Sequence, residues 1–167
     1  MPIATPRDLF VHELSIALSA EQIIAELLPI MREEATNPLL KEGFARHLVD
    51  TRQQATNLLR IFELIGATPD GSPCYPAEGM RREHDLLVAG NPPPEVLDLG
   101  LLDGAIKTEH FEIGAYAALI SFATALHESR TVALLKENLR QEQYTAEQLE
   151  LVVAKRLTEV AKMAVPA

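Results

Sequence analysis

The chain has 167 residues, of which 47% are apolar and 23% charged, and its formal net charge is -9 at pH 7. An acidic surface repels phosphate backbones, so these numbers argue against a nucleic-acid partner. The chain has one cysteine, Cys74, no signal-peptide pattern, and no apolar run near the roughly 20 residues of a membrane span, so we expect a cytoplasmic protein with no membrane partner.

Two helices are predicted for the first 66 residues. Thr5 and Pro6 form a cap and first turn, and apolar residues at steps of three and four continue to about residue 35, with a bend expected at Pro29. Asn37-Pro38 repeats the cap signal, and Gly66 is placed to end the second helix. Because about two residues join these helices, they must run antiparallel.

The rest of the chain predicts a crossover and a second hairpin. Residues 67–96 carry breakers at both ends and one short helix over 77–89. A third long helix is expected over 97–126, and a fourth from Ser129 to about residue 163. This order predicts an all-α protein: a ferritin-like four-helix bundle forming a single domain over residues 1–167.

Three of the long helices place a glutamate on the stripe that should be buried. At about 100° per residue, Glu21 falls within roughly 20° of the line through Phe10 and Leu28. Glu109 and Glu142 are centred in the same way on the third and fourth helices. A buried carboxylate must be protonated, paired with a cation or bound to a metal.

Further candidate ligands lie one turn away or on the remaining helix. Glu112 follows Glu109 at i+3, and the second helix offers His47 and Asp50 at the same spacing, with Gln54 one turn on. Carboxylates from facing helices, with such i, i+3 pairs, are how bundle cores bind two irons or manganeses. The alternative is that each glutamate pairs with a Lys or Arg, although Lys107 and Arg140 fall on other faces of their helices.

Other residues are weaker candidates. Tyr116 lies on the buried stripe and is either a partner of a carboxylate or core filler, and Cys74 is expected in a loop or an interface. His110 is expected at the rim of the core. We expect three further histidines at the surface, namely His12, His84 and His127.

Taken together, these residues give the chain a resemblance to the YciE/YciF-type ferritin-like bacterial stress proteins. The matching segments are Asp8-Leu9-Phe10, Ser19-Ala20-Glu21, His47-Leu48 with Asp50-Thr51, Cys74 with Ala77-Glu78-Gly79-Met80, Glu109-His110-Phe111-Glu112-Ile113 with Tyr116, and Leu134-Leu135-Lys136-Glu137 followed by Glu142. The resemblance implies a bundle that is usually dimeric, a di-iron or similar centre, and a link to stress responses, but no settled activity.

The chain also departs from the family pattern. Asp50 stands where the family usually has Glu, Ala146 and Val49 stand where it has acidic residues, and Ile16 and Leu18 replace Asp and Tyr. These changes are compatible with weaker metal binding, a single-metal site or a silent one.

Three hypotheses therefore remain open at the level of sequence. The first is a protein that binds iron or manganese through Glu21, His47, Asp50, Glu109, Glu112 and Glu142, with oxidase or peroxidase-like chemistry. The second is a non-enzymatic dimeric scaffold with a degenerate site. The third, a histidine phosphotransfer bundle using His47 or His110, is the weakest.

Overall fold

Helices are the only regular secondary structure in the described part of the chain. A computed structural model describes the backbone of residues 3–163 and the side chains of residues 3–158. Its elements are α1 (Pro6–Glu34), α2 (Pro38–Ile65), α3 (Tyr75–Ala89), α4 (Pro94–Ala125) and α5 (Ser129–Met163). The predicted all-α class is confirmed, while Met1, Pro2 and residues 164–167 of the expected domain lie outside the described residues.

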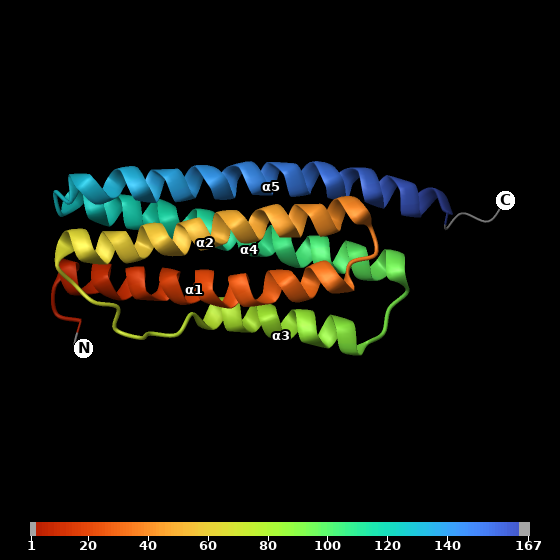
Figure 1. Cartoon of the computed structure of the whole chain (residues 1–167), viewed down its shortest axis with the longest axis horizontal. Helices are drawn as coiled ribbons and strands as arrows, with labels where there is room; N and C mark the ends of the chain where they lie inside the picture. The colour runs from red at the N-terminus through yellow and green to blue at the C-terminus, as the bar shows by residue number, and fades with distance from the viewer. Residues whose placement is uncertain (1–2, 164–167) are drawn as a thin grey trace.

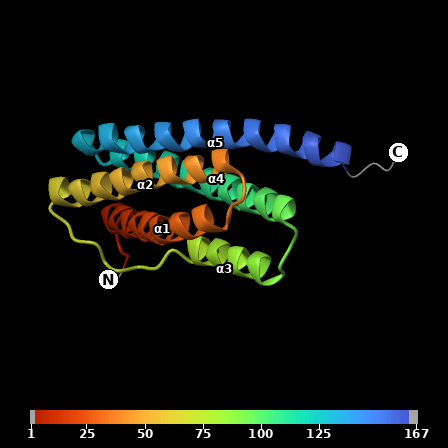
Figure 2. The ribbon, with the colours of Figure 1, turned by 45° about the vertical axis from the view of Figure 1, so that its right-hand side comes forward.

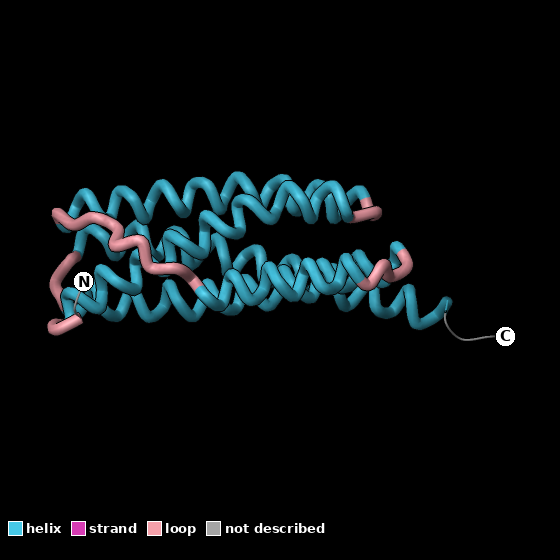
Figure 3. The backbone as a smooth tube through the Cα atoms, turned by 90° about the horizontal axis from the view of Figure 1, so that it is seen from below, coloured by secondary structure: helices cyan, strands magenta, loops and turns pink. Residues whose placement is uncertain are grey.

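The four long helices form two antiparallel hairpins, α1 with α2 and α4 with α5, lying side by side (Figure 1). The connection after α2 runs back along the bundle before α3 begins (Figure 3). Helix α3 then lies on the outside, against α1 and α4 (Figure 2). The predicted order of hairpin, crossover and hairpin is therefore confirmed.

Helix boundaries follow the capping residues. Asp8 N–H donates to Thr5 Oγ1 at 3.1 Å and Thr5 N–H donates to Asp8 Oδ2 at 2.9 Å, which is a capping box. Gly66 ends α2 with a φ of 65°, a left-handed conformation that glycine adopts without steric cost. Helix α4 begins at Pro94, earlier than expected, because a proline that stops one segment can also occupy the first turn of the next.

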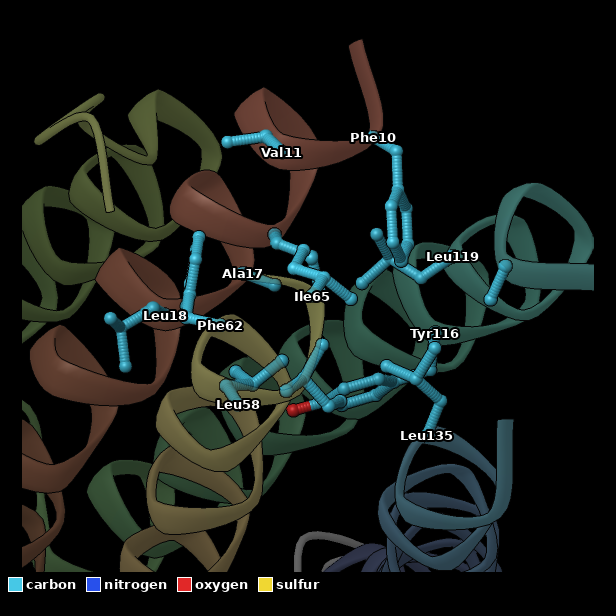
Figure 4. Packing of buried hydrophobic residues seen from close by; sticks show 13 residues of the cluster. Phe10, Val11, Ala17, Leu18, Leu58, Phe62, Ile65, Tyr116, Leu119 and Leu135 are labelled. Carbon is cyan, nitrogen blue, oxygen red and sulfur yellow. The ribbon is translucent and has the colours of Figure 1, made fainter. Parts of the chain in front are cut away.

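Two apolar clusters fill the interior. One includes Phe10, Leu58 and Leu135, and the ring of Tyr116 lies between Leu58 and Leu135 (Figure 4). The other includes Ile24, and its further members come from α1, α2, α4 and the segment around Cys74. Several of the buried polar residues, among them His47, Gln54, Glu109, Glu112 and Glu142, lie between these clusters along α2, α4 and α5, so the middle of the bundle contains a polar layer.

Helix α1 is long and apolar enough, by length and composition alone, to cross a membrane. This differs from the expectation that no apolar run would reach that length. Half of its most apolar window is buried in the bundle, as in the core helix of many proteins, and a signal sequence would pass the same test. The absence of a membrane partner stays a prediction.

Candidate metal centre

Four side chains from three helices converge in the polar layer. They are His47 on α2, Glu109 and Glu112 on α4, and Glu142 on α5, and one ligand atom of each lies within 4.8 Å of the others. His47 Nε2 lies 3.2 Å from Glu109 Oε1. The sequence pattern predicted all four, and the fold brings them together.

These groups are buried without compensating cations. Glu109 and Glu142 are fully buried, and the buried charged side chains in the described range include no Lys or Arg. Both oxygens of Glu109, one each of Glu112 and Glu142, and Nε2 of His47 accept or donate no hydrogen bond within that range. The alternative of interhelical pairing with Lys or Arg is therefore wrong for this cluster.

Burial and mutual repulsion shift the protonation of the cluster. Burial is the main cause that raises the pKa of Glu142 to about 7. Burial, and then repulsion by neighbouring carboxylates, raise the pKa of Glu109 and Glu112 well above the usual range. Burial also lowers the pKa of His47 to about 4. At neutral pH His47 is an uncharged imidazole whose nitrogen can bind a metal.

Glu21 approaches the cluster from α1. It is buried, and burial followed by repulsion from Glu142 raises its pKa well above the usual range. The hydroxyl of Tyr116 donates a hydrogen bond to Glu21 Oε1, while Glu21 Oε2 has no hydrogen-bond partner among the described residues. Tyr116 is thus both core filler and partner of a carboxylate, so the two sequence interpretations are both correct.

Asp50 lies at the edge of the centre. It is half-buried, one turn beyond His47, and its charge raises the pKa of both Glu109 and Glu142. It lies outside the four-residue group whose ligand atoms approach within 4.8 Å. The six candidate ligands therefore divide into a tight group of four, with Glu21 and Asp50 flanking it.

A chain of hydrogen bonds supports the centre and links all four long helices. Asn57 on α2 donates to Asn138 Oδ1 on α5 at 2.7 Å. Asn138 Nδ2 donates to the hydroxyl oxygen of Tyr116 at 3.0 Å, and Tyr116 donates to Glu21. Gln54 donates to Glu142 Oε1. Sequence analysis missed both asparagines, although Asn138 lies one turn before Glu142 on the same buried stripe.

Asp98 is a further buried carboxylate, and it was not predicted from the sequence. Its oxygens accept bonds from the backbone N–H and hydroxyl of Thr36, both at 2.7 Å, and from the N–H of Asn37 at 3.1 Å. These contacts hold the α1–α2 connection against α4. The signal in the sequence was its position three turns before Glu109 on the same helical face.

The remaining histidines lie outside the group of four candidate ligands. His110 is exposed and lies 2.9 Å from Glu150 Oε1, as expected for a rim residue. The prediction that His84 lies at the surface is wrong, because its side chain is 8% exposed and contacts Glu34 Oε2 at 2.7 Å. His12 is partly covered by Asp70, whereas His127 is exposed.

Cys74 is fully buried at the start of α3, and its N–H donates to Ser19 Oγ at 3.0 Å. The expectation of a loop residue is therefore confirmed, and the structure adds that this loop residue is part of the second apolar cluster.

Two of the departures from the family pattern differ in consequence. Val49 is 66% exposed, so an acidic residue there would point to solvent rather than to the centre. Ala146 is buried one turn after Glu142. The replacement at 146 therefore removes a buried donor position, while the replacement at 49 does not affect the interior.

The residues present fit a hard divalent metal. Several buried carboxylate oxygens and one imidazole nitrogen that lack hydrogen-bond partners among the described residues are the donor set that iron(II) and manganese(II) accept.

Comparison with known proteins agrees with this arrangement of helices. A family profile described as a domain of unknown function (DUF892) matches residues 5–162. The chain belongs to the DUF892 family.

Individual relatives of this DUF892 protein align with most of its length. It is 30% identical to protein YciF of Escherichia coli over 146 residues, which are 87% of this chain and 88% of the relative. The crystal structure of YciF, called a stress protein, superposes with a TM-score of 0.90, covering 93% of this chain and 99% of that one. The resemblance stated from the sequence, and the helical-bundle fold, are confirmed.

Two further structures match. YcfI of Rhodopseudomonas palustris, described as a candidate structural protein, is 34% identical with a TM-score of 0.86, covering 89% of this chain and 94% of that one. A protein of Xanthomonas campestris pv. campestris is 19% identical with a TM-score of 0.75, covering 95% and 98%, and supports the fold alone.

Proposed function

We propose that this DUF892 protein binds iron or manganese in the polar layer of its bundle, in a centre that holds one or two ions. The observation that carries the proposal is the group of His47, Glu109, Glu112 and Glu142, whose buried ligand atoms face one another without hydrogen-bond partners in the described range or buried cations. Leaving such charges uncompensated is costly, and a divalent cation would remove the cost.

The side chains have separable roles in this proposal. Glu109, Glu112, Glu142 and His47 would hold the metal, with Glu21 and Asp50 as flanking ligands. Tyr116 fixes the orientation of Glu21, and Gln54 that of Glu142, as partners of metal ligands commonly do. The two apolar clusters lie on either side of the centre along the bundle. A bound iron or manganese would supply redox chemistry toward oxygen or peroxide, which is the basis for proposing oxidase or peroxidase-like activity.

Metal analysis of the purified protein tests this function. Plasma mass spectrometry before and after anaerobic addition of Fe(II) or Mn(II) should find one to two ions per chain. The variant Glu109→Gln/Glu142→Gln should retain almost none, whereas a matched control variant at two α5 glutamates outside the centre, Glu137→Gln/Glu147→Gln, should bind like the parent. Equal metal content in both variants, or none in the parent, would reject the centre.

The second candidate is a non-enzymatic helical scaffold whose centre is degenerate. Two points favour it: YcfI is described as a candidate structural protein, and the buried Ala146 stands where the resemblance stated from the sequence leads one to expect an acidic residue. In a scaffold, the double variant should be folded and more stable than the parent, and metal should leave thermal stability unchanged for both.

Phosphotransfer through a histidine conflicts with the geometry. His47 is 6% exposed and faces carboxylates, and His110 is paired with Glu150. A phosphoryl acceptor has to be reached by its donor and should not face negative charge. This third hypothesis is dropped.

We further infer from the family relationship that the protein acts in stress responses in the cytoplasm as a homodimer. The evidence for a stress role is the description of YciF as a stress protein. Sedimentation velocity at several concentrations tests the dimer, and a loss of survival under oxidative stress in a deletion strain, restored by the parent gene, tests the role.

A further inference from the structure

A groove runs between α2 and α5, where the two hairpins meet. Its volume is about 570 Å³, within the range of about 300–1,000 Å³ typical of small-molecule sites. It extends from Tyr144 to Arg156 along α5, and a rise of twelve residues along a helix corresponds to about 18 Å. The groove is therefore long and narrow, and it suits a linear ligand.

The floor and walls of the groove are mostly apolar. Leu40 and Phe44 on α2 and Leu102 on α4 are buried at its base, and Leu149 and Val152 on α5 form the opposite wall. Gly43 lies on the α2 side, and a Cβ at that position would meet no atom within 4 Å. A glycine within a helix costs about 1 kcal/mol relative to alanine, and here it leaves the groove without a side chain from that position.

The two ends of the groove differ in charge. Lys155 and Arg156 line the outer end, whereas the inner end beside the candidate metal centre is lined by His47, Asp50 and Arg46, and Arg46 is paired with Glu42 at 2.9 Å. Asp98 also borders the groove, but its carboxylate is engaged by Thr36 and Asn37. An anionic head would thus be attracted to the outer end, and an uncharged tail would end near His47.

We propose that the α2–α5 groove binds a single-chain aliphatic anion of medium length, such as a free medium-chain fatty acid, with its carboxylate at Lys155 and Arg156 and its tail directed toward His47. This binding site goes beyond the metal-dependent function and does not require it. It brings the end of an acyl chain next to the centre.

Titration calorimetry with metal-free protein and dodecanoate, below its micellar concentration, tests the site. We expect one ligand per chain, and roughly fivefold weaker binding of dodecanol, since an exposed charge pair contributes little more than that. Because no metal is present, a failure here leaves the metal proposal intact, and a failure of metal binding leaves this one intact.

Substitutions in the groove test whether dodecanoate binds there. Gly43→Leu, which fills the groove, should weaken dodecanoate binding by about tenfold or more. Its matched control, Gly79→Leu on α3, also adds a side chain where a Cβ meets nothing within 4 Å and should bind like the parent. Lys155→Glu should weaken binding by roughly fivefold, and the control Lys136→Glu should not. Dodecanoate should also shift the imidazole resonances of His47 and leave those of His127 unchanged.

Several results would overturn the proposal. They are no dodecanoate binding by the parent, equal losses in Gly43→Leu and Gly79→Leu, or an unshifted His47. Capture by anionic phospholipid vesicles without binding of free dodecanoate would assign the groove to a membrane surface. A change of sedimentation coefficient in Gly43→Leu without an effect on dodecanoate would assign it to a second copy of the chain.

Discussion

Nε2 of His47 on α2 lies 3.2 Å from Oε1 of Glu109 on α4, and neither atom forms a hydrogen bond with a described residue. Burial lowers the pKa of His47 to about 4, so at neutral pH the imidazole does not neutralise the carboxyl group. Two such atoms, one from each hairpin, are an arrangement that a shared cation would stabilise. A metal ion bound by this pair would therefore also stabilise the bundle, because the two residues belong to different hairpins.

The variant Glu142→Gln should stabilise the metal-free protein. Burial raises the pKa of Glu142 from 4.5 to about 7, so ionising it in the folded state at pH 8 costs on the order of 3 kcal/mol. The neutral amide avoids that cost and can still accept the hydrogen bond from Gln54. Urea denaturation at pH 8 in the presence of a chelator measures the gain. The control Glu147→Gln, exposed on the same helix, should change stability by less than about 0.5 kcal/mol.

The stability of the metal-free protein should fall as pH rises above about 6.5. The pKa of Glu142 is about 7 in the folded state, above its unfolded value, so the folded state binds more protons and the advantage is lost as pH rises through 7. The pKa of His47 is shifted the other way, to about 4, and this raises stability with pH only up to the unfolded value near 6.5.

Thermal unfolding between pH 6.5 and 8.5 checks this dependence. The melting temperature should decrease over that window with chelator present, and saturating Mn(II) should flatten the curve. A melting temperature that increases with pH in the chelated protein would contradict the raised carboxyl pKa values.

Tyr116→Phe should weaken the hydrogen bonding around the centre while leaving the packing of the apolar core intact. The phenyl ring keeps its place between Leu58 and Leu135, but Glu21 loses a donor and Asn138 loses an acceptor. We expect a loss of about 1–3 kcal/mol in unfolding free energy and a fall of about 10–100-fold in metal affinity. Denaturation and metal titration measure the two effects. Tyr75→Phe, at an exposed position, is the control and should leave both unchanged.

Asp98→Ala should destabilise the α1–α2 connection. The carboxylate accepts bonds from the N–H and hydroxyl of Thr36 and from the N–H of Asn37, and its removal leaves these donors without a partner. We expect a loss of about 2–4 kcal/mol, with faster amide exchange at residues 36 and 37. Asp103→Ala, which removes an exposed carboxylate paired with Lys107, should cost less than about 1 kcal/mol.

The sequence by itself determined the helices and most of the centre. Thr5, Asn37 and Gly66 mark helix ends because capping depends on residues within one turn. Glu21, Glu109 and Glu142 could be assigned to the interior because the period of 3.6 residues fixes which side of a helix each residue occupies.

Only the tertiary structure decided which of those side chains meet. A helical period gives the direction of a side chain but neither the rotation nor the axial offset of one helix against another, and these depend on packing. For this reason the sequence could mark Asp50 as a candidate ligand but could not show that it lies at the edge of the centre. The hydrogen bonds donated by Asn57 and Asn138 could not be predicted for the same reason.

The packing of α3 over α1 likewise covers His84, which the local sequence placed at the surface. The groove beside His47 exists because α2 and α5 belong to different hairpins, and their separation is set by the whole bundle rather than by either helix.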